Sequence, residues 1–278
     1  MDLKQLEGKS VYILREAKAQ FKNPAILCSF GKDSILMLHL IKKTFDSVPF
    51  PVIYIDTGCD FPETRAFMSE VKKEFGLKIV VARNEEAIKK KTSPDNGEPE
   101  CCTALRTDAL KQAMKKGGFD ALIVGIRRDE HGMRSKEHFF SPRDNDFRWK
   151  VCEEDKEGSS DSGLKSLQDP EFSGWDIYAS EYSDTSHVRV HPLLHWTEEE
   201  VWEYILQKGI KVNPLYFSKN GKRYRSLGCI PCTQPVESDA KTVEAIIIEL
   251  KKSKNAERHG RLSANQYAMK KLQSLGYI

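Results

Sequence analysis

The sequence has almost no excess charge and no long apolar run. Its 278 residues carry 44 Lys and Arg against 41 Asp and Glu, which leaves a formal net charge of +3. Because no strongly basic field results, the composition argues against nucleic acid and anionic membranes as partners. The longest apolar stretches, 52–55 and 121–124, are far shorter than the roughly 20 residues that cross a bilayer, so we expect no membrane span.

A secretory signal and a disulfide framework are also missing. Residues 1–20 contain neither a basic stretch followed by an apolar one nor a cleavage site, so we predict a cytoplasmic protein. Seven cysteines are an odd number in a chain long enough to fold without cross-links, which favours reduced thiols or metal ligands. Hydrophobic residues make up 39%, which is enough for a buried core.

Short apolar runs alternate with amphipathic helices in the first half of the sequence. We expect strands at 25–28, 52–55, 79–81 and 121–124, and helices from about residue 3 and at 35–45, 62–75 and 103–116. This alternation indicates βαβ units, so the predicted fold class is α/β: a doubly wound parallel sheet with helices on both faces. Ligands of such sheets bind beyond the carboxyl ends of the strands.

The alternation ends after residue 130. Residues 131–190 form a predicted insertion, in which the acidic, Gly- and Ser-rich stretch 153–163 is expected to be a mobile surface segment. A capping box at Thr197–Glu200 then starts a helix, and a last helix is predicted at 243–252. We therefore expect one α/β domain at 1–195 and a helical C-terminal region at 196–278, packed as a cap or tail on the same domain.

The segment Ser29-Phe-Gly-Lys-Asp-Ser34 lies between the first predicted strand and the next helix. Backbone N–H groups and the positive end of the helix meet there, which suits a phosphate group. Gly31 allows close approach of the backbone, and Ser29 and Ser34 can donate hydroxyl hydrogen bonds. Lys32, as an exposed charge, can reach the oxygens of a pyrophosphate. The spacing is not that of a Walker A loop, and the alternative is an ordinary polar turn with a solvated lysine.

The same loop resembles the pyrophosphate loop of the adenine nucleotide α-hydrolase-like superfamily, whose usual form is Ser-Gly-Gly-Lys-Asp-Ser; Phe30 replaces the first Gly. Asp56-Thr-Gly58 with Phe61–Thr64 is similar to the second-strand motif of phosphoadenylyl-sulfate reductases and their sulfurylase relatives. Gly125–Glu130 and Arg134–Glu137 resemble the small, nucleotide-binding subunit of bacterial sulfate adenylyltransferases. The resemblance continues in order over nearly the whole chain, through 147–149, 190–193, 196–198, 214–216, 225–228 and 257–261.

This resemblance implies an adenine nucleotide α-hydrolase-like fold and adenylyl transfer in sulfate assimilation, in which ATP and sulfate give adenylyl sulfate and pyrophosphate. It implies ATP and Mg²⁺ as cofactors. It also implies a GTPase subunit as partner, which must be a separate polypeptide because the chain contains no GTPase loop. The expected nucleotide-binding residues are Ser29, Phe30, Gly31, Lys32, Asp33, Ser34, Asp56, Thr57, Gly58 and Gly125, and the expected catalytic residues are Lys32, Arg127 and Arg128.

Arg127 and Arg128 follow the fourth predicted strand, at the edge of the sheet to which the first loop also points. Guanidinium groups bind sulfate oxygens bidentately, so we expect this pair to orient sulfate. The alternative is a pair of surface arginines matched to Asp129 and Glu130. Asp56 ends the second predicted strand, where it would bind the nucleotide, organise Mg²⁺, or serve as a turn or helix-capping residue.

Four cysteines depart from the sulfurylase pattern. Cys101-Cys102 and Cys229-Ile-Pro-Cys232 form two close pairs, and segment 227–236 resembles the cluster-binding segment of iron–sulfur adenylyl-sulfate reductases, which pair it with an upstream Cys-Cys. The four residues Cys101, Cys102, Cys229 and Cys232 are therefore candidate ligands of a [4Fe–4S] cluster or of Zn²⁺. The alternative is four reduced thiols. We expect the two pairs to converge near the carboxyl edge of the sheet.

Three other functions stay open. One is a thiol- or cluster-dependent reductase of adenylyl sulfate or its 3′-phosphate. Reductases of this superfamily carry the attacking cysteine in a C-terminal tail, and no cysteine follows Cys232, so Cys229 or Cys232 would have to attack. The second is an ATP-dependent sulfurtransferase that uses a cysteine pair, and the third is a nucleotide-binding subunit without enzymatic activity. His191 and His195 are further candidates for substrate contact, although structural roles are commoner for such histidines.

Overall fold

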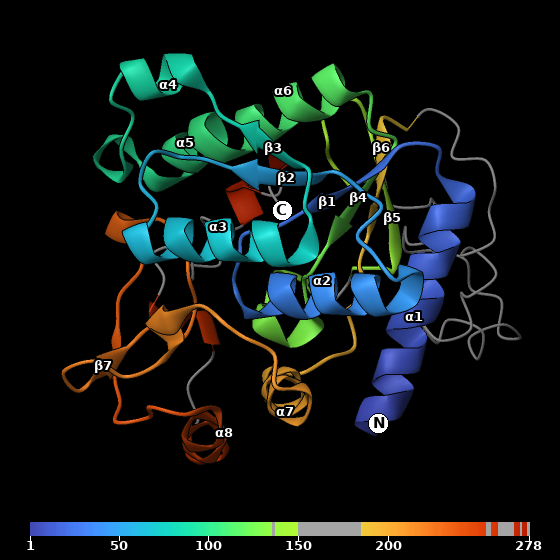
Figure 1. Ribbon diagram of the computed structural model, residues 1–278. Coiled ribbons are helices and arrows are strands. Elements are labelled where there is room, and N and C mark those ends of the chain that lie inside the picture. The colour runs from blue at the N-terminus through green and yellow to red at the C-terminus, as the bar shows by residue number, and fades with distance from the viewer. Residues whose placement is uncertain (135–136, 150–184, 254–256, 261–269, 273, 277–278) are drawn as a thin grey trace, which may run out of the picture.

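The computed structural model describes residues 1–134, 137–149, 185–253, 257–260, 270–272 and 274–276. The centre of this described part is a six-stranded sheet in the order β3-β2-β1-β4-β6-β5 (Figure 1). The strands are β1 (Pro24–Leu27), β2 (Val52–Ile55), β3 (Ile79–Ala82), β4 (Ala121–Val124), β5 (Phe140–Arg143) and β6 (His187–Val190). The predicted α/β class is confirmed.

The strand order reverses at β1, which lies between β2 and β4. β1 is parallel to both neighbours, with Ile26 opposite Val52 on one side and Ile123 on the other. The connections that leave β1 and β4 therefore diverge and open a crevice beyond the carboxyl ends of these strands, which is where such sheets bind ligands.

The sheet is parallel as predicted except for one antiparallel pair at its edge. β5 pairs antiparallel with β6, and Ser141 lies opposite Arg189. Antiparallel neighbours need no crossover helix between them, so the strand–helix alternation that predicts parallel strands gives no signal for this pair. Both strands belong to the predicted insertion at 131–190, and its acidic stretch at 153–163 lies outside the described residues.

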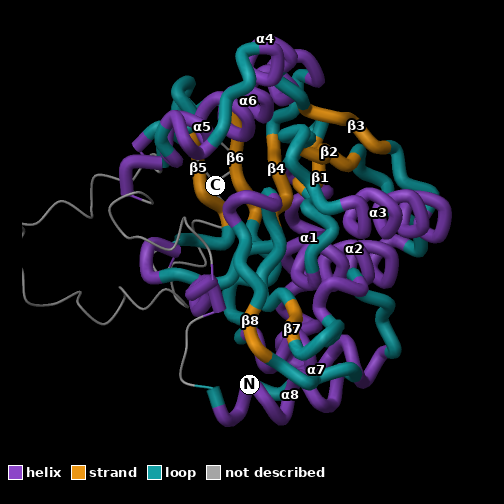
Figure 2. The backbone as a smooth tube through the Cα atoms, turned by 90° about the vertical axis from the view of Figure 1, so that its left-hand side faces the viewer, coloured by secondary structure: helices purple, strands orange, loops and turns teal. Residues whose placement is uncertain are grey.

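Helices cover both faces of the sheet, as predicted. On one face α1 (Leu3–Gln20), α2 (Lys32–Phe45) and α3 (Pro62–Phe75) pack against the sheet, and on the other lies α6 (Asp108–Gly117) (Figure 2). Successive residues of each strand pack against helices on opposite faces of the sheet, because side chains alternate in direction along a strand. Among the described residues no helix is both long enough and apolar enough to span a membrane.

The helix predicted at 103–116 consists of three pieces. α5 (Glu98–Cys102) continues into a π-helical turn, Thr103–Thr107, and then into α6. Single π-turns inside α-helices shift the facing of the side chains and are frequent at functional sites. A short helix, α4 (Glu85–Lys89), precedes them, capped by Asn84; it was not predicted because five residues show no hydrophobic period.

The C-terminal third shares its core with the sheet. α7 (Glu198–Lys208) begins at the predicted capping box, and it packs against α8 (Val243–Lys252). Trp196 and Trp202 are buried in the same cluster as α1 and α2, and Trp196 Nε1 donates a hydrogen bond to Ser10 Oγ at 2.9 Å. A small antiparallel pair, β7 (Lys222–Arg223) and β8 (Val236–Glu237), was not predicted.

The shared core gives a first testable prediction. Trp202 is fully buried, whereas Leu206 on the same helix is 40% exposed. We expect Trp202→Ala to lower the free energy of unfolding by about 3–5 kcal/mol, because it leaves a cavity where α7 meets the sheet domain. The matched control Leu206→Ala should cost less than about 1 kcal/mol. Chemical denaturation of both variants checks this, and equal losses would show that α7 adds little to the core.

Candidate functional site

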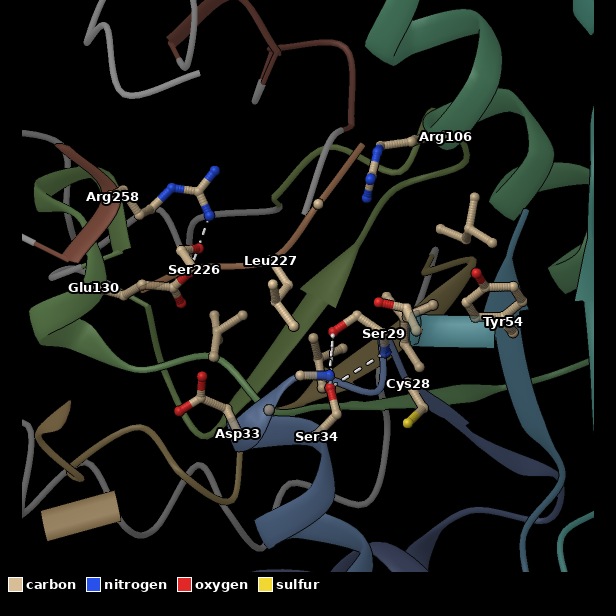
Figure 3. Close-up of a pocket in the computed structure, with 18 of the residues that line it drawn as sticks. Cys28, Ser29, Asp33, Ser34, Tyr54, Arg106, Glu130, Ser226, Leu227 and Arg258 are labelled. Carbon is tan, nitrogen blue, oxygen red and sulfur yellow. Dashed lines mark hydrogen bonds and ion pairs between the residues drawn. The ribbon is translucent and has the colours of Figure 1, made fainter. Parts of the chain in front are cut away.

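A pocket opens at the carboxyl ends of β1, β2 and β4, in the crevice where the strand order reverses. Its walls come from stretches far apart in the sequence, within 27–34, 54–64, 106–107, 124–134, 216–228 and 257–258. In Figure 3, Arg106 and Arg258 reach toward this space from opposite sides, above Ser29, Asp33 and Ser34. The loop predicted to bind phosphate therefore forms part of the lining.

The loop at 29–34 joins β1 to α2 with its polar groups on the pocket side. The hydroxyl oxygens of Ser29 and Ser34 lie 3.1 Å apart, and the Ser29 N–H donates to Ser34 Oγ at 3.2 Å. α2 begins at Lys32, whose N–H donates to Tyr216 Oη at 2.9 Å. The N-cap, Gly31, has no side chain to cap the helix, and Gly31, Asp33 and Ser34 line the pocket, so the positive end of α2 lies at the pocket wall.

The backbone conformation at Phe30 is one that favours glycine, the usual residue at this position in the resembling loops. Its backbone has φ +57°, in the left-handed region that costs a residue with a side chain about 1–2 kcal/mol. The ring is fully buried and meets Tyr54 edge to face, with centroids 5.7 Å apart. Burial of an aromatic ring contributes free energy of at least this size, so the packing offsets the backbone strain.

The backbone also approaches closely at two glycines of the site. A Cβ on Gly31 would lie 3.1 Å from Tyr216 Oη, and a Cβ on Gly125 would lie 3.3 Å from the carbonyl oxygen of Asp33. Gly125 therefore lets the end of β4 pack against the start of α2. Both positions require glycine because the backbone is close to a neighbouring group, which was predicted for Gly31.

A buried charge cluster lies beneath the loop, and it corrects the expectation that Lys32 is exposed. Lys32 and Arg127 are 1% and 0% exposed. Both donate to Glu257, and both contact Asp33, with Lys32 Nζ 3.1 Å from Asp33 Oδ2. Burial alone raises the pKa of Glu257, but Arg127 and Lys32 lower it overall. We call these four residues, Lys32, Asp33, Arg127 and Glu257, the ion cluster.

The two arginines predicted to orient sulfate lie outside the pocket lining. Arg127 is occupied by the ion cluster and by Asp129, whose Oδ1 lies 2.9 Å from Arg127 Nε. Arg128 donates to the carbonyl oxygen of Glu137 at 3.1 Å and lies 3.3 Å from His195 Nδ1. Both arginines thus bind protein groups in this structure.

Three other guanidinium groups do line the pocket, those of Arg106, Arg134 and Arg258. Arg134 and Arg258 both pair with Glu130, and Arg258 Nη1 lies 3.0 Å from Glu130 Oε1. Arg106 donates to Cys229 Sγ at 3.2 Å. Arg106 was not among the predicted site residues, because it lies in the π-helical turn that follows Cys102, and such a turn has no signature in the sequence.

Asp56 organises the loop that follows β2. Its Oδ1 accepts from the Gly58 N–H at 2.9 Å, and its Oδ2 accepts from Arg83 Nη1 at 2.8 Å. Burial raises the pKa of Asp56, but the Gly58 N–H and the Arg83 and Arg65 guanidiniums lower it overall. Asp56 therefore holds the turn after β2, which was one of its three predicted roles, and Asp60 of the same loop lines the pocket.

Five thiols gather beside the pocket. Burial first, and then Cys102, Cys229, Cys232 and Cys59, raise the pKa of Cys101 to about 12, so all five lie within electrostatic reach. Cys59 was not among the predicted ligands; its carbonyl oxygen accepts from the Ile230 N–H at 2.8 Å. Within the described part of the chain, however, no three His, Cys, Asp or Glu side chains form a metal-binding group. The metal assignment stays a prediction.

Cys229 differs from its neighbours because a cation faces its sulfur. Burial opposes ionisation, but the Arg106 guanidinium and the Thr57 hydroxyl, 3.2 Å from Sγ, lower the pKa of Cys229 overall. Arginine contacts of this kind raise the thiolate fraction, which is the nucleophilic form. A thiolate-stabilising site therefore adjoins the pocket through Arg106.

The histidines are held by protein groups. His191 is fully buried, and its Nδ1 lies 2.8 Å from the carbonyl oxygen of His138. His195 lies against Arg128 and the ring of Phe139, with ring centroids 4.8 Å apart. Neither lines the pocket. Their contacts favour the structural role for both.

Comparison with known proteins identifies the family. The profile of the phosphoadenosine phosphosulfate reductase domain matches residues 23–235. Sulfate adenylyltransferase subunit 2 of Marinomonas sp. is 38% identical over 94% of this chain and 91% of its own length. The chain belongs to the sulfate adenylyltransferase subunit 2 family. Another member of this family, from Acinetobacter baumannii (strain AYE), is 37% identical over 99% of this chain and 97% of its own.

Solved structures agree with the fold of this sulfate adenylyltransferase subunit 2 family member. Phosphoadenylyl-sulfate reductase from Candida auris, in a phosphate complex, is 19% identical, with a TM-score of 0.56 over 84% of this chain and 96% of that chain. FMN adenylyltransferase from Candida glabrata, with FMN and an ATP analogue, is 16% identical, with a TM-score of 0.54 over 84% of this chain and 64% of that chain. The predicted superfamily fold is confirmed.

Two buried histidines predict how stability depends on pH. Burial, with nearby arginines, lowers the pKa of His187 to about 2 and that of His191 to about 4, against an ordinary value near 6.5. The unfolded chain therefore binds these protons below about pH 6.5 while the folded protein does not, so stability falls as the pH drops. Each histidine contributes a slope of up to about 1.4 kcal/mol per pH unit.

Urea unfolding between pH 7 and 5 measures this slope, and His191→Gln should reduce it by up to half. Glu137 does not disturb the measurement between pH 7 and 5. Its pKa is lowered to about 2, so the stability that ionised Glu137 contributes is lost only when the pH falls below about 4.5. A slope unchanged by His191→Gln would contradict a neutral buried imidazole.

Proposed function

We propose that the chain is the nucleotide-binding subunit of a sulfate adenylyltransferase, which forms adenylyl sulfate and pyrophosphate from ATP and sulfate. The observation that carries this proposal is the serine-, glycine- and lysine-containing loop at 29–34, which lies at the open end of α2 in a pocket lined by three guanidinium groups. Relatives 37–38% identical over nearly the full chain are named sulfate adenylyltransferase subunit 2.

The reaction needs positioning more than a covalent nucleophile. Sulfate attacks the α-phosphorus of ATP in line, and pyrophosphate leaves. Lys32, Ser29 and Ser34 would hold the leaving pyrophosphate, and the N–H groups at the start of α2 would add partial positive charge. Thr107 lines the pocket, and its Oγ1 is buried without a hydrogen-bond partner among the described residues, so a polar ligand can use it.

In addition to the groups that hold pyrophosphate, the reaction needs a cationic group that binds sulfate near the α-phosphorus. Arg106 is the best candidate, because it lines the pocket opposite Arg258. Arg127 and Arg128, the predicted sulfate-orienting residues, would support the site from behind: Arg127 holds Asp33 at the start of α2, and Arg128 binds the carbonyl oxygen of Glu137.

The remaining predictions concern residues and groups that would complete the site. The predicted nucleotide-binding set also includes Phe30, Gly31, Thr57, Gly58 and Gly125, of which Gly31 and Gly125 line the pocket. Mg²⁺ finds no complete ligand set in the described part of the chain, so phosphate oxygens would have to supply most of its ligands. The name subunit 2 borne by the relatives supports a second subunit, for which the resemblance implies a GTPase. A cytoplasmic location also stays a prediction.

Pyrophosphate release tests this function. Incubation with ATP and sulfate, with and without a GTPase subunit, should release pyrophosphate only when sulfate is present. Lys32→Gln should lower kcat/KM for ATP by about 10²–10³-fold, and Arg106→Ala should raise the KM for sulfate about tenfold with little effect on ATP. The control Arg15→Ala changes an exposed arginine of α1 and should match the wild type.

Lys32 is buried, so circular dichroism must first show that Lys32→Gln folds. If sulfate-dependent turnover survives in a folded Lys32→Gln variant, the loop at 29–34 is not the pyrophosphate site. Equal losses for ATP and sulfate in Arg106→Ala would instead assign Arg106 to the nucleotide.

A second candidate function is favoured by one observation, the Arg106–Cys229 contact of 3.2 Å beside the pocket. A reductase needs a thiolate that attacks the sulfur of adenylyl sulfate, which forms an S-sulfocysteine and releases AMP. A second thiol then attacks the cysteine sulfur, so a disulfide forms and sulfite leaves. Cys229 would be the attacking thiolate, and Cys59 is a near thiol for the second step.

Adenylyl sulfate with dithiothreitol separates the two functions. We expect no sulfite above the background of a Cys229→Ser variant, because the proposed reaction makes and breaks bonds at the α-phosphorus and leaves the sulfur of sulfate unattacked. Sulfite released by the wild type and lost in Cys229→Ser would establish the reductase.

The predicted metal site on Cys101, Cys102, Cys229 and Cys232 has its own test. Anaerobically purified protein should contain iron with a visible absorption shoulder, or one equivalent of Zn²⁺, and Cys229→Ser should lower the metal content and the thermal stability. Cys28→Ser is the matched control, because Cys28 is buried at the end of β1 and is not among the thiols that act on Cys101. If the purified protein contains neither metal, the four cysteines are reduced thiols and the predicted metal site does not exist.

A further inference from the structure

The carboxylate of Glu257 lies where an anionic ligand of the loop would be expected. It contacts Lys32 Nζ through one oxygen and Arg127 Nη2 through the other. Glu257 belongs to a short 3-10 helix, Glu257–Gly260, and lines the pocket together with the loop at 29–34. A segment more than 200 residues away in sequence thus bridges the two buried cations of the ion cluster.

This bridge leaves Lys32 inaccessible to a solvent-borne anion. The side chain is 1% exposed, and its ammonium group contacts Glu257 and Asp33. A phosphate oxygen that reaches Lys32 Nζ must replace at least one of these carboxylates. Asp33 is the next residue along α2 and is also held by Arg127, so Glu257 is the partner that can leave without changing the helix.

We propose that Glu257 is an internal competitor for the phosphate-binding groups, and that the pyrophosphate portion of the nucleotide displaces it from Lys32 and Arg127. This inference rests on the proposed function of the loop at 29–34. The exchange replaces one negative partner of the two cations with another, so neither cation is left buried without a counter-charge at any stage.

The neighbouring residue suits such an exchange. Arg258 lines the pocket and pairs with Glu130 at 3.0 Å, and Glu130 also pairs with Arg134. The segment is therefore attached at two neighbouring residues of opposite charge: Glu257 pairs with the two cations of the ion cluster, and Arg258 pairs with the carboxylate of Glu130. Displacement of Glu257 would remove a negative charge from the pocket while Arg258, still attached through Glu130, keeps its positive charge there.

Binding of inorganic pyrophosphate by calorimetry tests the proposal. Glu257→Gln removes the competing charge, so the binding-competent state is more populated and pyrophosphate should bind about tenfold more tightly than to the wild type. Glu249→Gln is the matched control: Glu249 also pairs with a buried arginine, Arg223, but does not line the pocket, so its affinity should equal that of the wild type.

Affinity equal to or weaker than the wild type in folded Glu257→Gln overturns the proposal, because Glu257 would then hold Lys32 in place rather than compete with the ligand. Absence of pyrophosphate binding in the wild type and in Glu257→Gln alike overturns both the exchange and the assignment of the loop. Binding in both without tightening overturns the exchange alone.

Hydrogen exchange of the wild type gives a second measurement that does not depend on the folding of a variant. Saturating inorganic pyrophosphate should speed amide exchange at 257–260, because the segment loses its attachment to Lys32 and Arg127. Unchanged or slower exchange at these amides, with binding demonstrated in the same sample, contradicts displacement.

Discussion

Two buried cations, Lys32 and Arg127, require counter-charges inside the protein, and this requirement joins the parts of the chain that build the pocket. An unpaired charge in the interior costs several kcal/mol, so both side chains can be buried only when oppositely charged partners lie beside them. Asp33 supplies one partner from the start of α2, and Glu257 supplies another from the C-terminal part of the chain. The ion cluster thereby holds the loop after β1, the loop after β4 and the C-terminal segment against one another.

The same requirement gives the pocket its chemical character. Its guanidinium groups contact protein groups: Arg134 and Arg258 pair with Glu130, and Arg106 donates to the Cys229 sulfur. Such a site accepts an anion by exchanging partners, so binding depends on which internal partner can leave. The contact between Arg106 and Cys229 also links the state of the thiols to the cationic wall of the pocket, because a thiolate and a bound sulfate would compete for the same guanidinium.

The sequence predicted those elements whose local signals are strong. β2, β4, α3 and α8 have the predicted bounds, since each is an apolar run or a periodic helix with distinct neighbours. β6 was expected only as a strand without bounds that ends near His191, because its sequence, His187-Val-Arg-Val190, is half polar. Arg189 is buried there, and its guanidinium donates to the carbonyl oxygen of Gly276 at 2.9 Å. A partner so distant in sequence leaves no local signal.

Within the site, too, only the features with a local sequence signal were predicted. The loop at 29–34 was predicted because a strand, a glycine-containing turn and a helix follow one another directly, which is a local pattern. The burial of Lys32 was not, since its partner Glu257 lies 225 residues away. Arg127 and Arg128 were predicted as sulfate-binding residues from their position after β4. Their side chains bind Asp33, Glu257 and Glu137 instead, and tertiary packing brings these partners to them.

The structure of the protein bound to a non-hydrolysable ATP analogue tests the central claim most directly. We expect the β- and γ-phosphate oxygens to lie within about 3.2 Å of Lys32 Nζ and of the Ser29 and Ser34 hydroxyls, and Glu257 no longer to contact Lys32. Phosphates bound elsewhere in the pocket, with the contact between Lys32 and Glu257 intact, would contradict it.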